Sequence, residues 1–184
     1  MRAFIAVEFS PEVKQKIHQI QGKLRKYKTD VKWVEEKNYH LTLSFLGEIS
    51  SEQADAIISV ISSGLQNISS FEIVLSGLGV FPNKRNPRVI WMGITQGQKE
   101  LNFIYSLLKN ILQEMDFEFS NNFKPHVTLG RVRSRKNIED LISSLPKISF
   151  TFNDYISEIV FMESKLLPKG PVYTQIFSFK LKES

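Results

Sequence analysis

The sequence predicts an α+β fold with two pseudo-symmetric lobes, each with an antiparallel-rich sheet and packed helices. The 184-residue chain carries the pattern His, apolar, Thr, apolar twice, beginning at His40 and at His126. The predicted elements have the same order in both halves: strand, helix, strand, motif strand, helix, strand. The spacing also agrees, because Phe4 precedes His40 by 36 positions and Ile90 precedes His126 by 36. We therefore expect residues 1–184 to form a single two-lobed domain with a groove between the lobes.

The first half opens with an alternating strand and a helix whose start is marked by Ser10 as N-cap and Pro11 at the first helical position. A second helix is predicted after Ser50 or Ser51, where a run rich in Ala, Ile and Val begins. In chain order, the predicted elements are a strand at 2–9, a helix at 12–27, a strand at 31–34, the motif strand at 39–46, a helix from 50 or 51 to 65, and a strand at 71–76.

The second half begins after a stretch rich in Gly and Pro, residues 77–88, which we predict to be a loop carrying Lys84, Arg85 and Arg88. The helix that follows is amphipathic, with apolar residues at helical spacing. In chain order, the predicted elements are a buried strand at 89–94, a helix at 99–114, an extended segment at 117–119, the motif strand at 126–132, a helix at 137–145, one or two strands within 148–161, a turn at 167–171, and a final strand at 172–181.

Composition excludes several classes of protein. Cysteine is absent, which removes disulfides, thiolate nucleophiles and thiolate metal sites. No apolar run approaches the ~20 residues needed to span a bilayer, and we expect a cytoplasmic protein without a signal peptide or a membrane segment. The formal charge of +5 is compatible with a ligand that carries phosphate, although it is also common in proteins that bind none.

The two motifs carry the residues for proton transfer at a phosphate. Alternation along a strand puts the His and the Thr of each motif on one face. A histidine with an ordinary pKa of ~6.5 can give or take a proton near neutrality. Two histidines on either side of a substrate can act as general base and general acid, and Thr42 and Thr128 can donate hydrogen bonds to phosphoryl oxygens.

Other catalytic chemistries lack their sequence signatures. There is no His-x-x-x-His pair and no aspartate-rich cluster beside either histidine, so no metal site is expected. There is no Gly-x-Ser-x-Gly elbow for covalent catalysis. There is also no Gly-x-x-x-x-Gly-Lys loop, so we expect no use of ATP. We therefore expect an enzyme without a cofactor.

Three further residues admit two interpretations each. His18 has no Thr partner and lies in a predicted helix, so it is interpreted as a solvated helix residue. Phe45 could stack on a base, but strict alternation places it on the face opposite His40, where it would be core. Strict alternation also turns Arg131 away from the His126 face, so a role at a phosphate requires a bulge or a strand end near Gly130. The basic residues around Arg131 could equally be a solvated charge run.

The chain resembles a known family over its whole length. The resemblance is carried by both motifs with their flanking residues and by five further segments: 2–7 (RAFIAV), 33–34 (WV), 77–82 (GLGVFP), 87–91 (PRVIW) and 170–173 (GPVY). On these residues the chain is similar to the RNA 2′,3′-cyclic phosphodiesterases, long called 2′-5′ RNA ligases, of the two-histidine phosphoesterase superfamily.

The resemblance implies a bilobal catalytic domain that hydrolyses a nucleoside 2′,3′-cyclic phosphate, free or at the end of an RNA or oligonucleotide, to the 2′-phosphate. The missing metal-site signatures add the expectation that this reaction needs no metal. The resemblance also implies that His40 protonates the departing 3′-oxygen and that His126 activates water. It further implies that Thr42 and Thr128 hold phosphoryl oxygens. Arg131 would pair with the phosphate and Phe45 would stack on the base. The two motifs are symmetric in sequence, so this division of roles comes from the resemblance alone.

Two alternatives remain open at this stage. The same histidines could serve the reverse reaction, joining a 2′,3′-cyclic phosphate end to a 5′-hydroxyl end through a 2′-5′ bond. The protein could also be an RNA-end-binding module that performs no chemistry. For hydrolysis, for ligation and for a binding module alike, we expect a monomer that does not associate with membranes.

Overall fold

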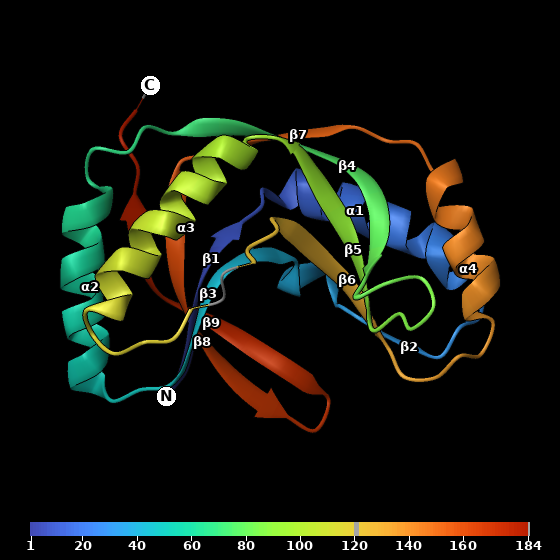
Figure 1. Ribbon diagram of the computed structural model, residues 1–184, viewed down its shortest axis with the longest axis horizontal. Coiled ribbons are helices and arrows are strands. Elements are labelled where there is room, and N and C mark those ends of the chain that lie inside the picture. The colour runs from blue at the N-terminus through green and yellow to red at the C-terminus, as the bar shows by residue number, and fades with distance from the viewer. Residues whose placement is uncertain (120–121, 184) are drawn as a thin grey trace.

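The computed structural model describes residues 1–119 and 122–183, which form two antiparallel sheets and associated helices (Figure 1). Sheet A contains, in spatial order, β3 (His40–Glu48), β1 (Arg2–Glu8), β8 (Glu158–Leu167) and β9 (Gly170–Lys180). Sheet B contains β2 (Val31–Trp33), β6 (His126–Val132), β5 (Val89–Gln96), β4 (Phe71–Phe81) and β7 (Phe152–Ile156). The helices are α1 (Pro11–Arg25), α2 (Ser51–Leu65), α3 (Gln98–Gln113) and α4 (Ile138–Ser144), with short 3₁₀ turns at Glu36–Asn38 and Leu145–Lys147. This arrangement confirms the predicted α+β class.

The predicted helix starts are confirmed by their capping hydrogen bonds. The Ser10 hydroxyl accepts from the backbone N–H of Val13, and Pro11 is the first residue of α1. Ser50 and Gln53 form a capping box at the start of α2, so each side chain satisfies a backbone N–H of the other residue. No helix in residues 1–119 or 122–183 combines the length and the apolar character needed to cross a membrane.

The loop predicted at 77–88 is wrong for its first part, and the predicted repeat of elements is incomplete. The expected loop at 77–88 is strand β4 as far as Phe81, because the glycines that suggested a loop serve the strand instead. Gly77 has a φ of 78° where the pairing register of β4 and β5 shifts, and Gly79 leaves room for the Trp91 ring on the neighbouring strand. The segment 117–119, predicted to be extended, belongs to no strand, so the second half lacks the strand that the repeated order of elements predicts before its motif.

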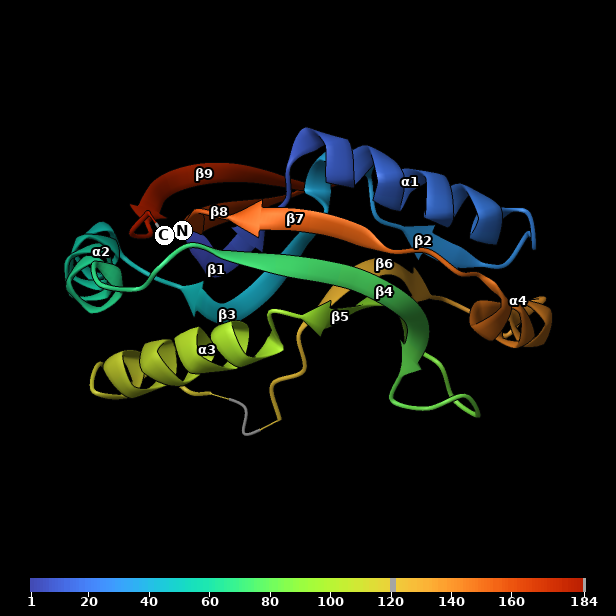
Figure 2. The same cartoon turned by 90° about the horizontal axis from the view of Figure 1, so that it is seen from above.

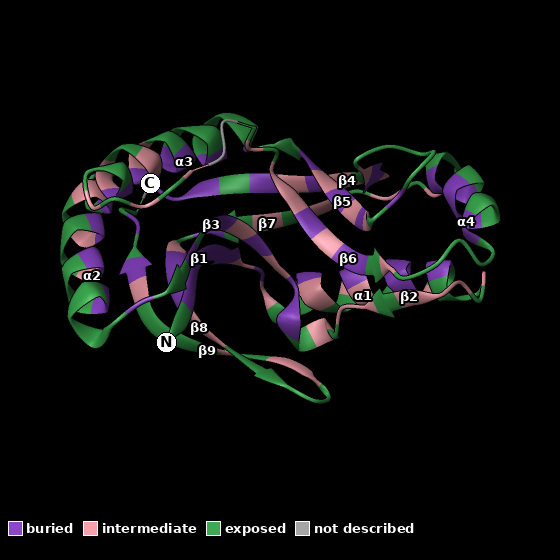
Figure 3. Cartoon of the chain, turned by 60° about the horizontal axis from the view of Figure 1, so that its bottom comes forward, coloured by how far each residue is buried: buried purple, intermediate pink, exposed green. Residues whose placement is uncertain are grey.

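The two motif strands lie next to each other. β3 is the first strand of sheet A, β6 is the second strand of sheet B, and the two are in contact. They run in opposite directions, as Figure 2 shows, so the residues that follow each motif lie toward opposite ends of the pair. The β8–β9 hairpin projects from the same region with an exposed tip (Figure 3).

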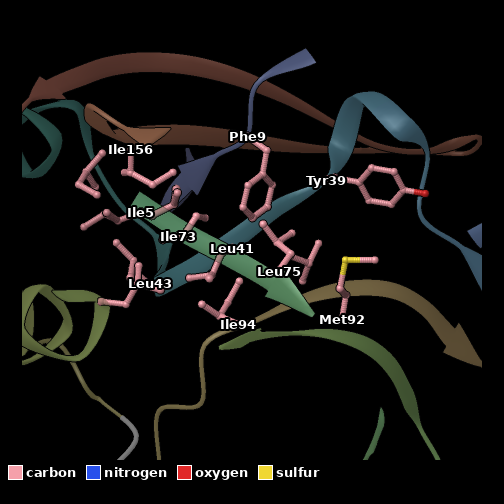
Figure 4. Packing of buried hydrophobic residues seen from close by; sticks show 14 of the residues in the cluster. Ile5, Phe9, Tyr39, Leu41, Leu43, Ile73, Leu75, Met92, Ile94 and Ile156 are labelled. Carbon is pink, nitrogen blue, oxygen red and sulfur yellow. The ribbon is translucent and has the colours of Figure 1, made fainter. Parts of the chain in front are cut away.

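One apolar core supports both sheets. The chain leaves sheet A after β1, contributes β2 to sheet B, and returns to sheet A with β3. Ile5 and Leu41 of sheet A therefore pack in the same cluster as Ile73 and Leu75 of sheet B (Figure 4). Burial of these side chains against each other fixes the two sheets relative to one another, and so fixes the relative position of the two motifs.

Candidate active site

A cleft of about 820 Å³ lies between the two sheets. It is lined from β3 by His40, Thr42 and Phe45, and from β6 by His126, Thr128 and Arg131. All six residues singled out from the sequence thus face one space, although 86 positions separate the two motifs.

A bulge in β3 changes which side Phe45 faces. Ala6 pairs with Thr42 and Ile5 pairs with Ser44, which leaves Leu43 as an extra residue in β3. An extra residue reverses the alternation beyond it. Phe45 therefore lies on the cleft side, where its side chain is 66% exposed and its ring centroid is 6.1 Å from that of Phe4. Of the two interpretations of Phe45, the core position that strict alternation gives is wrong, and the position on the cleft side is the one that stacking on a base requires.

A second bulge, at the equivalent place in β6, acts on Arg131. Trp91 pairs with Thr128 and Ile90 with Gly130, so Leu129 is the extra residue. The bulge returns Arg131 to the cleft side. Strict alternation in the sequence requires such a bulge near Gly130 for Arg131 to contact a phosphate.

His40 is oriented by two hydrogen bonds. Its Nδ1 lies 2.8 Å from the carbonyl oxygen of Asn38, and because a carbonyl can only accept, Nδ1 carries the proton. In the neutral ring Nε2 is then the acceptor, and it receives a hydrogen bond from the Thr42 hydroxyl at 3.0 Å. Asn38 is itself held in place, since its side-chain amide donates to the carbonyl of Pro171 at 3.2 Å.

His126 has the same orientation from an equivalent contact. Its Nδ1–H donates to the carbonyl oxygen of Lys124 at 2.7 Å, two residues before the histidine as in the first motif. The proton on Nδ1 leaves Nε2 as the basic nitrogen of the neutral ring. Across residues 1–119 and 122–183, Nε2 of His126 has no hydrogen-bond partner.

Aromatic rings hold both imidazoles. The rings of Phe4 and Tyr173 have centroids 5.0 and 5.2 Å from that of His40, and the Tyr173 ring is perpendicular to it. Phe81 meets His126 edge-on at 5.0 Å. Alternation alone gives no reason to select these three rings, because their contacts with the imidazoles depend on how distant strands pair. The carbonyl of Asn38 lies two residues before His40, but it precedes the strand and alternation does not single it out either. The only sequence signal for Tyr173 is its place in the segment 170–173 that carries the resemblance.

Burial lowers the pKa of both histidines below the ordinary value, because it disfavours the charged imidazolium. The bonds to the carbonyls of Asn38 and Lys124 act in the opposite direction. Nearby charges differ between the two sites. Glu8 raises the pKa of His40, whereas Arg131 lowers the pKa of His126. The charge of His126 also lowers the pKa of His40, which reflects their closeness.

The third histidine is not part of the cleft. His18 lies on α1, half-buried, with its Nδ1 3.5 Å from the Tyr39 hydroxyl. It is thus a packed residue of the helix rather than the solvated one expected. In the part of the chain that the structure describes, no group of three or more His, Cys, Asp or Glu side chains could hold a metal ion.

Comparison with known sequences places the chain in one family. Residues 7–91 and 93–173 match the family model described as LigT like phosphoesterase. An RNA 2′,3′-cyclic phosphodiesterase of Thermotoga maritima is 34% identical, with 96% of this chain and 94% of that protein aligned. A protein of the same name from Methanothermobacter thermautotrophicus is 33% identical, with 98% and 99% aligned.

Solved structures agree on the fold. TT0787 of Thermus thermophilus superposes with a TM-score of 0.84 at 28% identity, covering 98% of both chains. E. coli LigT in complex with 3′-AMP superposes with a TM-score of 0.80 at 25% identity, covering 98% of this chain and 97% of that one. The fold of this chain is therefore shared, over nearly its whole length, with both solved structures.

Proposed function

The chain belongs to the LigT-like phosphoesterase family, and from that premise we propose that it is an RNA 2′,3′-cyclic phosphodiesterase that works by paired histidine acid–base catalysis. It hydrolyses the cyclic phosphate at an RNA end to a 2′-phosphate. One observation carries the proposal: two imidazoles, each with Nδ1–H donated to a backbone carbonyl, present their basic Nε2 atoms in the same cleft. Relatives at 33–34% identity over nearly the whole chain are named for this activity.

The reaction requires one proton on each side of the phosphorus. Nε2 of His126 takes a proton from water as the water oxygen bonds to phosphorus. The bond between phosphorus and the 3′-oxygen breaks, and Nε2–H of His40 gives its proton to that oxygen. The 2′-oxygen keeps the phosphate, and proton exchange with solvent returns both rings to their starting states.

Surrounding charges support this division of roles. The base must be neutral at the start, and Arg131 disfavours the charged form of His126. The acid must be protonated. Burial lowers the pKa of His40 in the free protein, and Glu8 acts in the opposite direction, against the charges of Lys14 and His126. An anionic cyclic phosphate in the cleft raises the pKa of His40 further, because an opposite charge stabilises the imidazolium.

The remaining cleft residues match the other parts of the substrate. Thr42 and Thr128 donate to the non-bridging oxygens, on which negative charge increases in the transition state. When His40 is protonated its Nε2 no longer accepts, so the Thr42 hydroxyl is released to turn toward the phosphate. Arg131 pairs with the phosphate, and Phe45 offers an exposed ring to the terminal base.

The shared core and the chain crossing between sheets support one two-lobed catalytic domain over residues 1–184. A monomeric state, a cytoplasmic location and independence of ATP stay predictions.

The test is incubation of the protein with an oligonucleotide ending in a 2′,3′-cyclic phosphate, in excess EDTA, followed by mapping of the phosphate. The expected product is a 2′-phosphate end, formed at the same rate with and without the chelator. A 3′-phosphate product, or loss of activity in EDTA, contradicts the proposed mechanism. Adding a 5′-hydroxyl oligonucleotide in the same assay detects ligation as a joined product. Binding of 2′-phosphate ends without turnover would instead identify a non-catalytic module.

A further inference from the structure

Three cations form a row on the cleft side of sheet B. Lys32 of β2 pairs in register with Arg131 of β6, so both side chains leave the same face of the sheet. Arg133 comes two residues after Arg131, which is the spacing that returns a side chain to the same face. The pairing continues that far, because the N–H of Arg133 donates to the carbonyl of Asp30 at 2.9 Å. We call Lys32, Arg131 and Arg133 the cationic row.

The row is continuous with the cleft but extends past the motif. Lys32 and Arg131 line the cleft, and Arg133 lies ~7 Å further along the strand direction, two residue rises on. β3 and β6 run in opposite directions (Figure 2), so the row leads away from the end of the cleft where Phe45 lies.

The row is not neutralised by ion pairs. All three side chains are exposed, and within residues 1–119 and 122–183 none of them forms an ion pair or a side-chain hydrogen bond. Asp30 stands opposite Arg133 through this backbone hydrogen bond, and within the described residues its carboxylate forms no ion pair with the row. Arg135, by contrast, is engaged in the protein, since it pairs with Glu139 and donates to the carbonyl of Arg85.

Unpaired cations in line with a phosphate site suit a polyanion. A terminal base on Phe45 and a cyclic phosphate between the motifs leave the preceding nucleotides to continue along the other end of the cleft. Proteins that hold single strands without regard to sequence follow the backbone with positive charge.

We propose that Lys32 and Arg133 bind the phosphodiester groups preceding the terminal nucleotide of a single-stranded RNA, which makes an oligonucleotide end the preferred substrate over a cyclic mononucleotide. This inference rests on the proposed function, with Arg131 at the cyclic phosphate itself. The contact is made to the backbone and is therefore independent of base sequence.

The test compares kcat/KM for an octanucleotide ending in a 2′,3′-cyclic phosphate with kcat/KM for a nucleoside 2′,3′-cyclic monophosphate. The wild-type protein is expected to prefer the octanucleotide. In the double variant Lys32→Gln, Arg133→Gln the ratio of the two values falls about tenfold at ~0.1 M salt. For the octanucleotide, the slope of log kcat/KM against log salt concentration becomes shallower by about 1.4. This value follows because each phosphate of a single strand that a protein neutralises contributes ~0.7 to the slope, and the double variant neutralises two fewer.

Arg88 provides a matched control on the other face of the same sheet. Its carbonyl accepts from the N–H of Val132, so Arg88 stands opposite Val132 and not opposite Arg131. Its side chain is exposed like those of the row. Arg88→Gln removes one positive charge and is expected to leave the ratio of kcat/KM values and the salt dependence as in the wild type. Asp30→Asn, which removes the carboxylate of the residue opposite Arg133, is expected to increase the ratio.

The outcomes separate this inference from the proposed function. An unchanged ratio in the double variant, or an equal fall in Arg88→Gln, overturns the inference while hydrolysis persists. Failure of the wild-type protein to hydrolyse either substrate overturns the proposed function. In that case, binding of an octanucleotide with a 2′-phosphate end, measured by fluorescence anisotropy, still tests the role of the cationic row. Weaker binding by the double variant than by Arg88→Gln supports that role, and equal binding by the two variants refutes it.

Discussion

The two motif strands have the same geometry up to the bulge and differ after it. In each, the histidine is anchored through Nδ1 to the carbonyl two residues earlier, and a leucine three residues later is the extra residue of a bulge. The first residue that the bulge returns to the cleft is Phe45 in one strand and Arg131 in the other. The repeated part places the proton-transfer groups, and the part that differs gives one end of the cleft an aromatic ring and the other end a cation.

The strands also differ in what lies beside them. β6 is flanked by β2, whereas β3 is the outer strand of sheet A. In the second half, the segment 117–119 stands where a strand equivalent to β2 would be expected, and it forms no strand. This difference accounts for the residue that follows the extra leucine. It is Gly130 in β6, where a Cβ would lie against Val31 and Trp33, and Ser44 in β3.

The largest expected effect separates the roles of the histidines. His40→Ala and His126→Ala each lower kcat for a cyclic phosphate by roughly 10²–10⁴-fold, because each removes one proton transfer. Replacing the 3′-oxygen of the substrate by sulfur gives a leaving group that needs no protonation. The loss in His40→Ala should then be much smaller, while the loss in His126→Ala should persist. Recovery of both variants, or of neither, in single-turnover assays with the thio substrate contradicts the assigned division.

The threonines come next. Thr42→Val and Thr128→Val keep the shape of the side chain and remove one donor to the phosphoryl oxygens, which costs ~10²-fold in kcat. Only Thr42 also donates to the neutral histidine, so its replacement removes a bond that favours the uncharged ring. Thr42→Val is therefore expected to raise the pKa of His40 and move the alkaline limb of the pH profile upward. An equal upward movement of the alkaline limb in Thr128→Val would contradict the idea that the hydrogen bond from Thr42 to His40 sets the two motifs apart.

Apolar periodicity in the sequence is sufficient to predict the helices and strands that bury one face. The buried positions Val13, Ile17, Ile20 and Leu24 of α1 have helical spacing, and Ser10 marks the start of the helix. The His and Thr of each motif could be assigned to one face for the same reason, because alternation acts within a single strand.

The failures share a physical cause, which is that they depend on a neighbouring strand. Strict alternation places Phe45 in the core, because no local sequence signal predicts the bulge at Leu43, which arises from pairing with β1. Gly79 was interpreted as a loop residue, although its lack of a Cβ is required by Trp91 across the ladder. The electrostatic asymmetry of the histidines is of the same kind, since Glu8 lies far from His40 in sequence and opposite it in the sheet.

A smaller effect concerns stability and tests the difference in flanking strands. Gly130→Ser places a side chain where Val31 and Trp33 already lie, and overpacking of this kind costs about 1–3 kcal/mol in the free energy of unfolding. The reciprocal change, Ser44→Gly, removes a side chain from the outer strand and costs about 0.5–1 kcal/mol through backbone entropy. Urea denaturation of both variants measures the difference. Equal losses would mean that β2 does not explain the choice of glycine.

The smallest effect is a movement of the pH profile that distinguishes Arg131 from its counterpart Phe45. The positive charge of Arg131 lowers the pKa of His126, so Arg131→Gln raises it. Because the base must be unprotonated, activity is lost as pH falls through this pKa, and the acid limb of kcat/KM moves to higher pH. Phe45→Ala carries no change of charge and should leave the limb in place.

Phe45→Ala instead raises KM about tenfold, since stacking of one base contributes about 1–3 kcal/mol. The pH profiles of kcat and KM for both variants, recorded with a cyclic mononucleotide, give the position of the acid limb and the value of KM in one experiment. If the acid limb stays fixed in Arg131→Gln, or moves to lower pH, then His126 is not the group that must lose its proton, and the electrostatic basis for assigning it as the base is removed.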